Sequence, residues 1–359
     1  MPNLSDQLAS AMTDHEIDLL RVASHANRNV QALLAQLEDD IAGRLARSQL
    51  SAFARARLLI VQRDVQALIA EGYGAIDAVM SQQLSGLAVT EAAVLASVVN
   101  TSVGVSIMDG LLPRATLREL MTGKIIQGAP SSQWWARQAQ DLTFKFAQQV
   151  RLGMAQGETN DELVRRVRAI DGLFEQPRRA AEALVRTSVQ TVAGAARVAA
   201  MKENSDVLRG WQQVSTLDDR TTEVCIAYDL QTWDLDGNPL DDTTLPFVNE
   251  GGSEDGCPRH WGCRSGLVPL VKSWADLIGV DVEELEPSVR ASMDGEVAAK
   301  TTYSDWLRGK SEAQQDDALG AGKAALWRSG KITVTDLLDQ RGRPLTLAEI
   351  QAKHGVTAP

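Results

Sequence analysis

The chain has 359 residues, of which 44% are hydrophobic and 23% charged, and its formal net charge is −11 at pH 7. This length accommodates about two domains with a buried core, and the acidic balance argues against a dedicated nucleic-acid binder, whose affinity comes mainly from neutralising phosphates. No apolar run reaches the roughly 18 residues of a membrane span. The residues after Met1 have neither the basic start nor the apolar core of a secretory signal peptide. We therefore expect a protein that folds in a cytoplasm and has no membrane partner.

The charge is unevenly distributed along the chain. Residues 111–210 contain 15 Lys and Arg against 10 Asp and Glu, a local charge of +5, whereas residues 211–300 contain 6 against 18, a local charge of −12. The plain interpretation of the basic segment is a solvated helical face. A weak, non-specific contact with DNA is the alternative, and such a contact would weaken steeply with added salt.

Residues 1–111 are predicted to form a long helical arm. Thr13 and Glu16 have the spacing of a capping box, which predicts a helix start. An apolar stripe follows at intervals of three and four residues, made by Val30, Leu33, Leu37, Ile41 and Leu45. Because strict heptads are not sustained, we expect an antiparallel hairpin or small bundle and not a dimeric coiled coil.

Breaks in the arm are predicted from the phase of the apolar pattern and from glycines. The phase changes near Ser48, where a second stripe begins. Gly72, Gly74 and Gly86 predict turns or kinks, after which a separate Ala- and Val-rich stretch begins at Thr90. The arm is thus expected to contain three helical stretches.

The remainder of the chain is predicted as a compact segment, 112–270, followed by a helical tail, 271–359. Apolar spacing in the first of these predicts helices over 133–155, 159–170 and 177–204. Asp236-Gly237 between apolar residues predicts a β-hairpin turn. The expected fold is therefore mainly α, with a small α+β domain toward the C-terminus.

One cluster of residues carries the chemistry of a metal site. All three cysteines and one of the four histidines lie within 39 residues, as Cys225, Cys257, His260 and Cys263. The C-x-x-H and H-x-x-C spacings direct the last three side chains to one point, and Cys225 adds a ligand from a distant segment. Thiolate and imidazole ligands in a tetrahedral set suit zinc, and a disulfide is disfavoured in a cytoplasm. We predict a structural Zn²⁺ site, with buried free thiols as the alternative.

The same residues argue against catalysis. A catalytic zinc keeps an open position for water, whereas four protein ligands fill the coordination sphere. The sequence has no H-x-E before a P-C-x-x-C, and Leu19 stands where the zinc-protease motif beginning at His15-Glu16 needs its second histidine. It also has no Walker loop and no nucleophile elbow. The prediction is a protein that is not an enzyme.

Several motifs in this order resemble the phage Mu F-like family of head-morphogenesis, or minor head, proteins. Residues 184–187, with Arg186, resemble the A-R-T helix of the family, and residues 257–265 match its closing P-P-x-H-x-x-C-R-C/S motif with Cys257 at the first proline and Ser265 at the last position. The other matching residues are Asp218, Arg220 and Thr221 in a T-x-D-x-R-T-x-x-x-C motif that ends at Cys225, Asp236-Gly237 in the following turn, Arg264, and Trp306 in the tail. Because the family's ligand pattern differs here, the four-ligand zinc set depends on the residues themselves.

The resemblance implies a minor capsid protein of a tailed bacteriophage, built into the procapsid near the portal and assisting head assembly and DNA packaging or delivery. Its implied location is inside the phage head, after assembly in the bacterial host cytoplasm. Expected partners are the portal protein, on which the helical arm would dock, the major capsid or scaffold protein, and weakly bound packaged DNA. Asp218, Arg220 and Arg264 are expected to form internal ion pairs, with contact to a partner as the alternative.

Two other function classes stay open at this point. One is a zinc-containing enzyme or effector, nuclease-like, carried in the phage head. The other is a non-specific DNA-binding adaptor that uses the basic segment 111–210.

Overall fold

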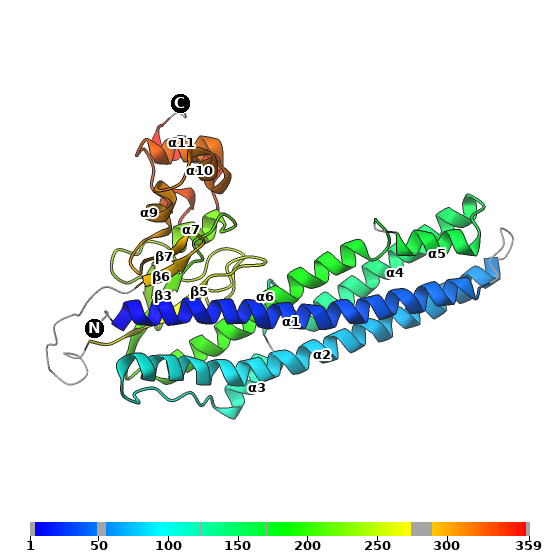
Figure 1. Cartoon of the computed structure of the whole chain (residues 1–359), viewed down its shortest axis with the longest axis horizontal. Helices are drawn as coiled ribbons and strands as arrows, with labels where there is room; N and C mark the ends of the chain where they lie inside the picture. Colours follow the sequence, from blue (N-terminus) through cyan, green and yellow to red (C-terminus); the bar gives the residue numbers. More distant parts are fainter. Residues whose placement is uncertain (1–3, 49–54, 123, 170, 274–288, 357–359) are drawn as a thin grey trace. The chain divides into compact units, whose positions relative to one another are not determined.

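The computed structural model of the chain describes residues 4–48, 55–122, 124–169, 171–273 and 289–356 (Figure 1). These residues form two compact units, each assembled from separate parts of the chain. Unit 1 comprises Met1–Leu20, Leu87–Thr122 and Gln190–Pro359, and unit 2 comprises Arg21–Gly86 and Gly123–Val189. Three long helices contribute to both units: α1 (Leu4–Ala46), α2 (Arg55–Val103) and α6 (Glu175–Glu203). The division into segments 1–111, 112–270 and 271–359 stays a prediction about organisation along the chain.

Helices α1 and α2 run antiparallel within each unit. In unit 2, Arg44 Nη2 of α1 lies 2.6 Å from Asp64 Oδ2 of α2. In unit 1, His15 Nε2 of α1 lies 2.8 Å from Glu91 Oε2 of α2. Both helices bury a stripe of residues spaced three or four apart, which is the pattern of an amphipathic helix packed on neighbours. On α2 the stripe within unit 2 consists of Val61, Val65, Ile69, Tyr73, Ile76, Met80 and Leu84.

The predicted change of helix near Ser48 agrees with the structure, in which α1 ends at Ala46 and α2 begins at Arg55, but the breaks predicted at the glycines were wrong. Helix α2 passes without interruption through Gly72, Gly74 and Gly86. A glycine in a helix interior costs only about 1 kcal/mol relative to alanine, which the buried stripe offsets. The predicted start at Thr13 was also wrong, because α1 already begins at Leu4 and the Thr13 hydroxyl donates to the Ala9 carbonyl one turn earlier.

Helix α2 is unusually long and apolar. The stretch Leu58–Val103 is long and apolar enough to cross a membrane by length and composition alone, and 33% of its most apolar window is buried inside the protein. A core helix passes the same test, and the buried stripe of α2 is the pattern of a helix packed on protein.

Unit 2 is completed by α4 (Ser131–Ala155), α5 (Asn160–Arg168), the first half of α6 and a small hairpin of β1 (Ile125–Ile126) and β2 (Ala129–Pro130). The three helices predicted over 133–155, 159–170 and 177–204 are therefore confirmed within a few residues. Helix α5 begins with a capping box in which Thr159 and Glu162 each bond the backbone of the other. Buried Trp135 and Phe146 fix the inner face of α4.

Unit 1 contains a three-stranded antiparallel sheet in the order β4-β3-β5, made by β3 (Leu208–Val214), β4 (Thr232–Asp234) and β5 (Gly266–Val271). Trp211 and Trp233 are cross-strand partners, and both are buried. The predicted turn follows β4, where Gly237 has a φ of +88° and Trp233 pairs with Pro239. Helix α3 (Arg114–Thr122) also belongs to unit 1.

The tail of unit 1 consists of short elements after β5. They are β6 (Val289–Ser292), β7 (Gly295–Ala298), α9 (Tyr303–Arg308), α10 (Glu312–Leu319), α11 (Ala321–Arg328), the 3-10 helix η1 (Thr335–Leu337) and α12 (Leu347–His354). Capping boxes at Thr302, Ser311 and Thr346 start three of them. The described residues are thus mainly helical with small antiparallel sheets, which confirms the predicted fold class.

A buried cluster of charges joins three helices of unit 1. Arg197 of α6 is 1% exposed and pairs with Glu16 of α1 and Glu91 of α2, while Gln190 Nε2 donates to Glu16 at 3.1 Å. Burial alone would raise the pKa of Glu91, but the charge of Arg197 and the hydrogen bond from His15 outweigh it and lower that pKa. The sequence analysis missed this cluster.

Two glycine-to-alanine substitutions test the close packing of β3 on β4 and the continuity of α2. At Gly210 of β3, an added Cβ would lie 2.1 Å from the Trp233 carbonyl oxygen, whereas at Gly86 of α2 it would meet nothing within 4 Å. We expect Gly210→Ala to destabilise unit 1 by about 1–3 kcal/mol or more, and Gly86→Ala to stabilise unit 2 by about 0.5–1 kcal/mol. Urea unfolding of each variant measures both effects, and a destabilising Gly86→Ala would contradict the continuous α2.

Candidate metal centre

The candidate ligands come from a short helix and from one irregular loop. Helix α7 (Glu223–Tyr228) carries Cys225, and the loop before β5 carries Cys257, His260 and Cys263. The loop is fixed from inside by Arg259, which is 1% exposed, lies 3.5 Å from the ring centroid of Tyr228 and donates to the Gln213 side chain and the Phe247 carbonyl. An arginine held by these contacts keeps the residues on either side of it in place.

Three of the four predicted ligands come together. Cys225 Sγ lies 3.3 Å from His260 Nε2 and 3.5 Å from Cys263 Sγ. The three ligand atoms all lie within 4.8 Å of one another, so this cluster could hold one metal ion. Both thiols are buried, at 2% and 3% exposure, whereas the histidine is half-buried.

The orientation of the His260 ring suits a metal ligand. Its Nδ1 lies 2.9 Å from the carbonyl oxygen of Trp261, which can only accept, so Nδ1 carries the hydrogen. The Nε2 atom then turns its lone pair toward the thiols and accepts from the Thr222 hydroxyl at 2.8 Å. A hydrogen bond from the distal ring nitrogen to a carbonyl is the usual support for a metal-binding histidine.

The cluster favours one thiolate. The hydrogen bond with Cys225 lowers the pKa of Cys263 well below its ordinary value. Hydrogen bonding to Cys263, together with burial, raises the pKa of Cys225 and Cys257 in turn. The Cys263 sulfur is therefore the centre of the group, and thiolate is the form that binds metal.

Cys257 stands apart from the other three. It is 3% exposed and neighbours Cys263, but its thiol donates to Gln213 Oε1 at 3.7 Å and lies outside the group whose ligand atoms are mutually close. Its role as a fourth ligand stays a prediction.

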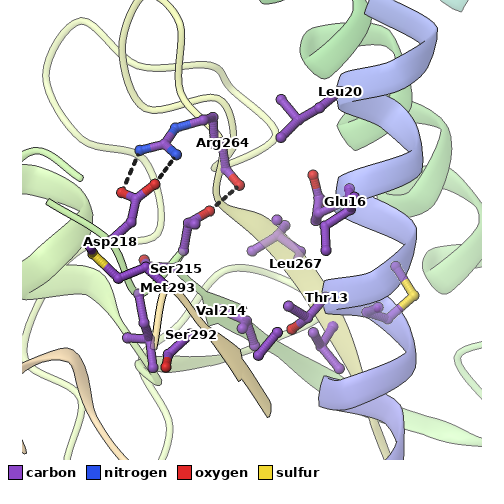
Figure 2. A pocket seen from close by; sticks show the side chains of 17 residues that line it. Thr13, Glu16, Leu20, Val214, Ser215, Asp218, Arg264, Leu267, Ser292 and Met293 are labelled. Atoms are coloured by element: carbon purple, nitrogen blue, oxygen red, sulfur yellow. Dashed lines mark hydrogen bonds and ion pairs between the residues drawn. The ribbon is translucent and has the colours of Figure 1, made fainter. Parts of the chain in front are cut away.

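The motif charges surround the cluster. Arg264 forms an ion pair with Asp218, with Nη2 at 2.7 Å from Oδ1, and Figure 2 shows the two side chains facing each other. Asp218 Oδ1 also accepts from the Arg220 amide at 3.0 Å and the Thr221 hydroxyl at 3.1 Å. The Arg220 side chain itself is 74% exposed and lies 3.7 Å from Asp218. Arg264 is thus internal, whereas the Arg220 guanidinium faces solvent.

The remaining predicted motif residues lie away from the three ligands. Asp236 and Gly237 form the turn after β4. Trp306 of α9 donates from Nε1 to Asp294 at 2.9 Å. Arg186 lies on α6 within unit 2, where its closest acidic partner is Glu182 at 4.0 Å. These residues therefore support the fold and do not contribute to the cluster.

An apolar groove of about 200 Å³ lies beside the Asp218–Arg264 pair. Figure 2 shows Thr13, Glu16 and Leu20 of α1 on one wall, with Leu267 and Met293 among the side chains across from them. The sequence analysis did not predict this groove, because its walls come from segments far apart in the chain. The charged cluster of Glu16, Glu91 and Arg197 does leave a sign in the sequence. Arg197 occupies a position of α6 that the spacing of Ala193 and Met201 marks as apolar.

Metal content of purified variants tests the cluster. The protein as isolated should carry one metal ion per chain, and Cys225→Ser, His260→Ala and Cys263→Ser should each reduce that content, because removal of one ligand weakens a site of this type severely. Cys257→Ser is the informative comparison, since retained metal indicates three protein ligands and lost metal adds Cys257. Wild-type protein that is folded and metal-free after expression with added metal would contradict the assignment.

Comparison with known proteins places one part of the chain. Residues 145–268 match the family model described as Phage Mu protein F like protein. No significant match was found among curated proteins or among solved structures. The matched segment includes α6, the β4-β3-β5 sheet except the end of β5, and all the candidate ligands. The resemblance seen in the sequence is thus confirmed for this segment, and residues 145–268 are similar to the Phage Mu protein F like family.

Proposed function

We propose that the chain is a minor capsid protein that acts in head morphogenesis of a tailed bacteriophage. The observation that carries this proposal is the family match over residues 145–268, a segment that includes the metal cluster and its supporting sheet. The match covers 124 of the 359 residues, and the first part of the arm and the tail lie outside it. The proposed location is the interior of the phage head, reached during procapsid assembly in the host cytoplasm.

The metal proposed for the cluster is a structural zinc ion. With Zn–S and Zn–N bonds of about 2.3 and 2.05 Å, a tetrahedral site has S···S and S···N separations of roughly 3.8 and 3.6 Å. The observed separations of 3.5 and 3.3 Å are a few tenths of an ångström shorter, and the third pair, Cys263 Sγ and His260 Nε2, lies within 4.8 Å. Zinc would supply the cross-link between α7 and the loop, with Cys257 or water in the fourth position.

A structural role is favoured over catalysis by the surroundings of the ligands. Among the described residues the cluster contains no carboxylate. Glu223, the closest acid on α7, pairs with Lys323 at 2.7 Å. A general base would have to be free to take a proton from a metal-bound water.

The portal protein is the expected partner of the arm 1–111, and the surface proposed here for a portal contact lies on α4, outside that arm. Phe144 and Leu152 on the outer face of α4 are 71% and 44% exposed, two large apolar side chains two helical turns apart. Exposed aromatic and aliphatic side chains in this arrangement suit a helix-in-groove contact. A capsid or scaffold subunit could use the same surface. No membrane partner is proposed.

DNA binding is the weaker second candidate. Several arginines of the basic segment already pair with acids of α1 or of their own segment in unit 2, including Arg168 with Asp39 at 2.6 Å and Arg178 with Glu38 at 2.5 Å. Paired arginines contribute less to phosphate binding, because the acid must be displaced first.

Metal removal tests the zinc proposal. Elemental analysis should give one zinc per chain, and dialysis against a chelator should lower the melting temperature of the transition that contains unit 1, since binding free energy is part of folding free energy at such sites. Zinc should restore it and magnesium should not. An unchanged melting temperature after verified metal loss would contradict a structural role.

Point substitution on α4 tests the portal proposal. The double variant Phe144→Ser with Leu152→Ser should fold normally, because both side chains are exposed, but should no longer co-purify with portal protein or procapsids. Gln148→Ser, on the same face between them, is the matched control. Deletion of the arm is less informative, because Leu8, Met12 and Leu95 of α1 and α2 belong to the core of unit 1. Normal incorporation of the double variant would place the docking surface elsewhere.

A further inference from the structure

Helix α7 has two separate functions in the packing of unit 1. Its Cys225 faces the metal cluster, while Ile226, 1% exposed, belongs to the apolar core of the tail together with residues such as Trp306, Leu326 and Ile350. At its first turn, Glu223 accepts from Lys323 Nζ of α11 at 2.7 and 2.9 Å. The same six-residue helix therefore holds a metal ligand and the tail.

A second connection passes through Asp218. The Tyr303 hydroxyl of α9 donates to the Asp218 carbonyl at 2.7 Å, and the Asp218 carboxylate pairs with Arg264, the residue after the ligand Cys263. Tyr303 is fully buried, and its amide donates at 2.7 Å to Asp229, the residue that ends α7. The beginning of α9 is thus bonded to Asp229, four residues after Cys225, and to Asp218, whose carboxylate pairs with the residue after Cys263.

A third connection joins the end of the tail to the ligand-bearing loop. The Glu250 amide donates to the Arg341 carbonyl at 2.8 Å, and an added Cβ at Gly342 would lie 2.5 Å from the Tyr228 hydroxyl. The neighbouring Asn249 side chain donates to the carbonyl of Arg259 at 3.2 Å. Residues 341–342 therefore rest against α7 and against the loop that carries His260.

We propose that metal binding at Cys225, His260 and Cys263 controls the docking of the tail, residues 303–354, onto the rest of unit 1. This inference rests on the proposed metal site and goes beyond it by naming what the metal regulates. An isolated helix of six residues is not stable in water, so the position of α7 depends on what anchors it. A metal bound by Cys225, His260 and Cys263 would cross-link α7 to the loop, and the tail uses both as its docking surface.

Metal loss therefore releases the tail and exposes its apolar core face. Chelation or oxidation of the cysteines would have this effect, since only the reduced, deprotonated thiols bind metal. By thermodynamic reciprocity, if bound metal strengthens tail docking by a given factor, a docked tail strengthens metal binding by the same factor. That reciprocity gives the inference two independent tests.

The first test is hydrogen exchange on the full-length protein with zinc bound and after chelation. Amides of α9, α10 and α11 should exchange at least about tenfold faster without metal, because their exchange then follows local release and not global unfolding. The sheet strands β3 and β5 and the helix α4 should change much less, which serves as the internal reference. Tail protection that is unchanged in metal-free protein, or equal loss of protection throughout unit 1, overturns the inference.

The second test measures zinc affinity in two tail variants by competition with a chromogenic chelator. Lys323→Ala removes the ion pair that crosses from the tail to Glu223, whereas Arg328→Ala removes an ion pair with Asp316 that stays inside the tail. We expect a several-fold weaker zinc affinity for Lys323→Ala and an unchanged affinity for Arg328→Ala. Equal zinc affinities for wild type and Lys323→Ala count against the coupling.

The two proposals fail in different ways. Wild-type protein that binds no zinc defeats the metal proposal and the tail inference together, and elemental analysis detects this directly. Zinc-binding protein whose tail exchange is independent of the metal defeats only the tail inference.

Discussion

The buried charge of Arg197 is the constraint on which the core of unit 1 depends. A guanidinium at 1% exposure must be compensated, and it is compensated by Glu16 of α1 and Glu91 of α2, so neither of those helices can move away from α6 without leaving an unpaired buried charge. The first residue of β5 must be small at this point, because a Cβ on Gly266 would lie 2.0 Å from Glu16 Oε1. One ionic cluster thus positions three helices and the edge of the sheet.

From that edge the chain leads directly to the metal cluster. Gly266 is three residues after Cys263, and the two residues between them are engaged on both sides: Arg264 with Asp218, and the Ser265 hydroxyl with Ser215 at 3.2 Å. The Ser215 hydroxyl in turn donates to the Cys225 carbonyl at 2.8 Å. These hydrogen bonds support the backbone of the ligand-bearing segments, as contacts beyond the ligands commonly do at metal sites.

The sequence predicted the metal cluster better than it predicted the arm. The spacing of His260 and Cys263 is local, so two ligands could be placed from the pattern alone, and Cys225 followed because thiols are scarce in this chain. Cys257 has the same local spacing, yet its thiol is bonded to Gln213, a residue of β3 that no spacing rule relates to it. In the arm, Gly72 was read as a break, although it allows close packing against Leu37 of the neighbouring helix, 3.1 Å from where a Cβ would lie.

The sequence by itself determined the helices over 133–155, 159–170 and 177–204, the turn at Asp236-Gly237, the phage Mu F-like motifs and the residue types able to bind a metal, because each of these depends on periodicity or spacing over a few residues. Only the tertiary structure decided that α2 is one helix, that Arg197 is buried in an ionic cluster, and that α7 serves the metal cluster and the tail at once. The ionic cluster and the contacts of the tail with α7 join residues about 75 to 180 positions apart, such as Glu16 with Arg197 and Asp229 with Tyr303. Pairings at such separations are selected by the packing of the whole core and leave no periodic signal in the sequence.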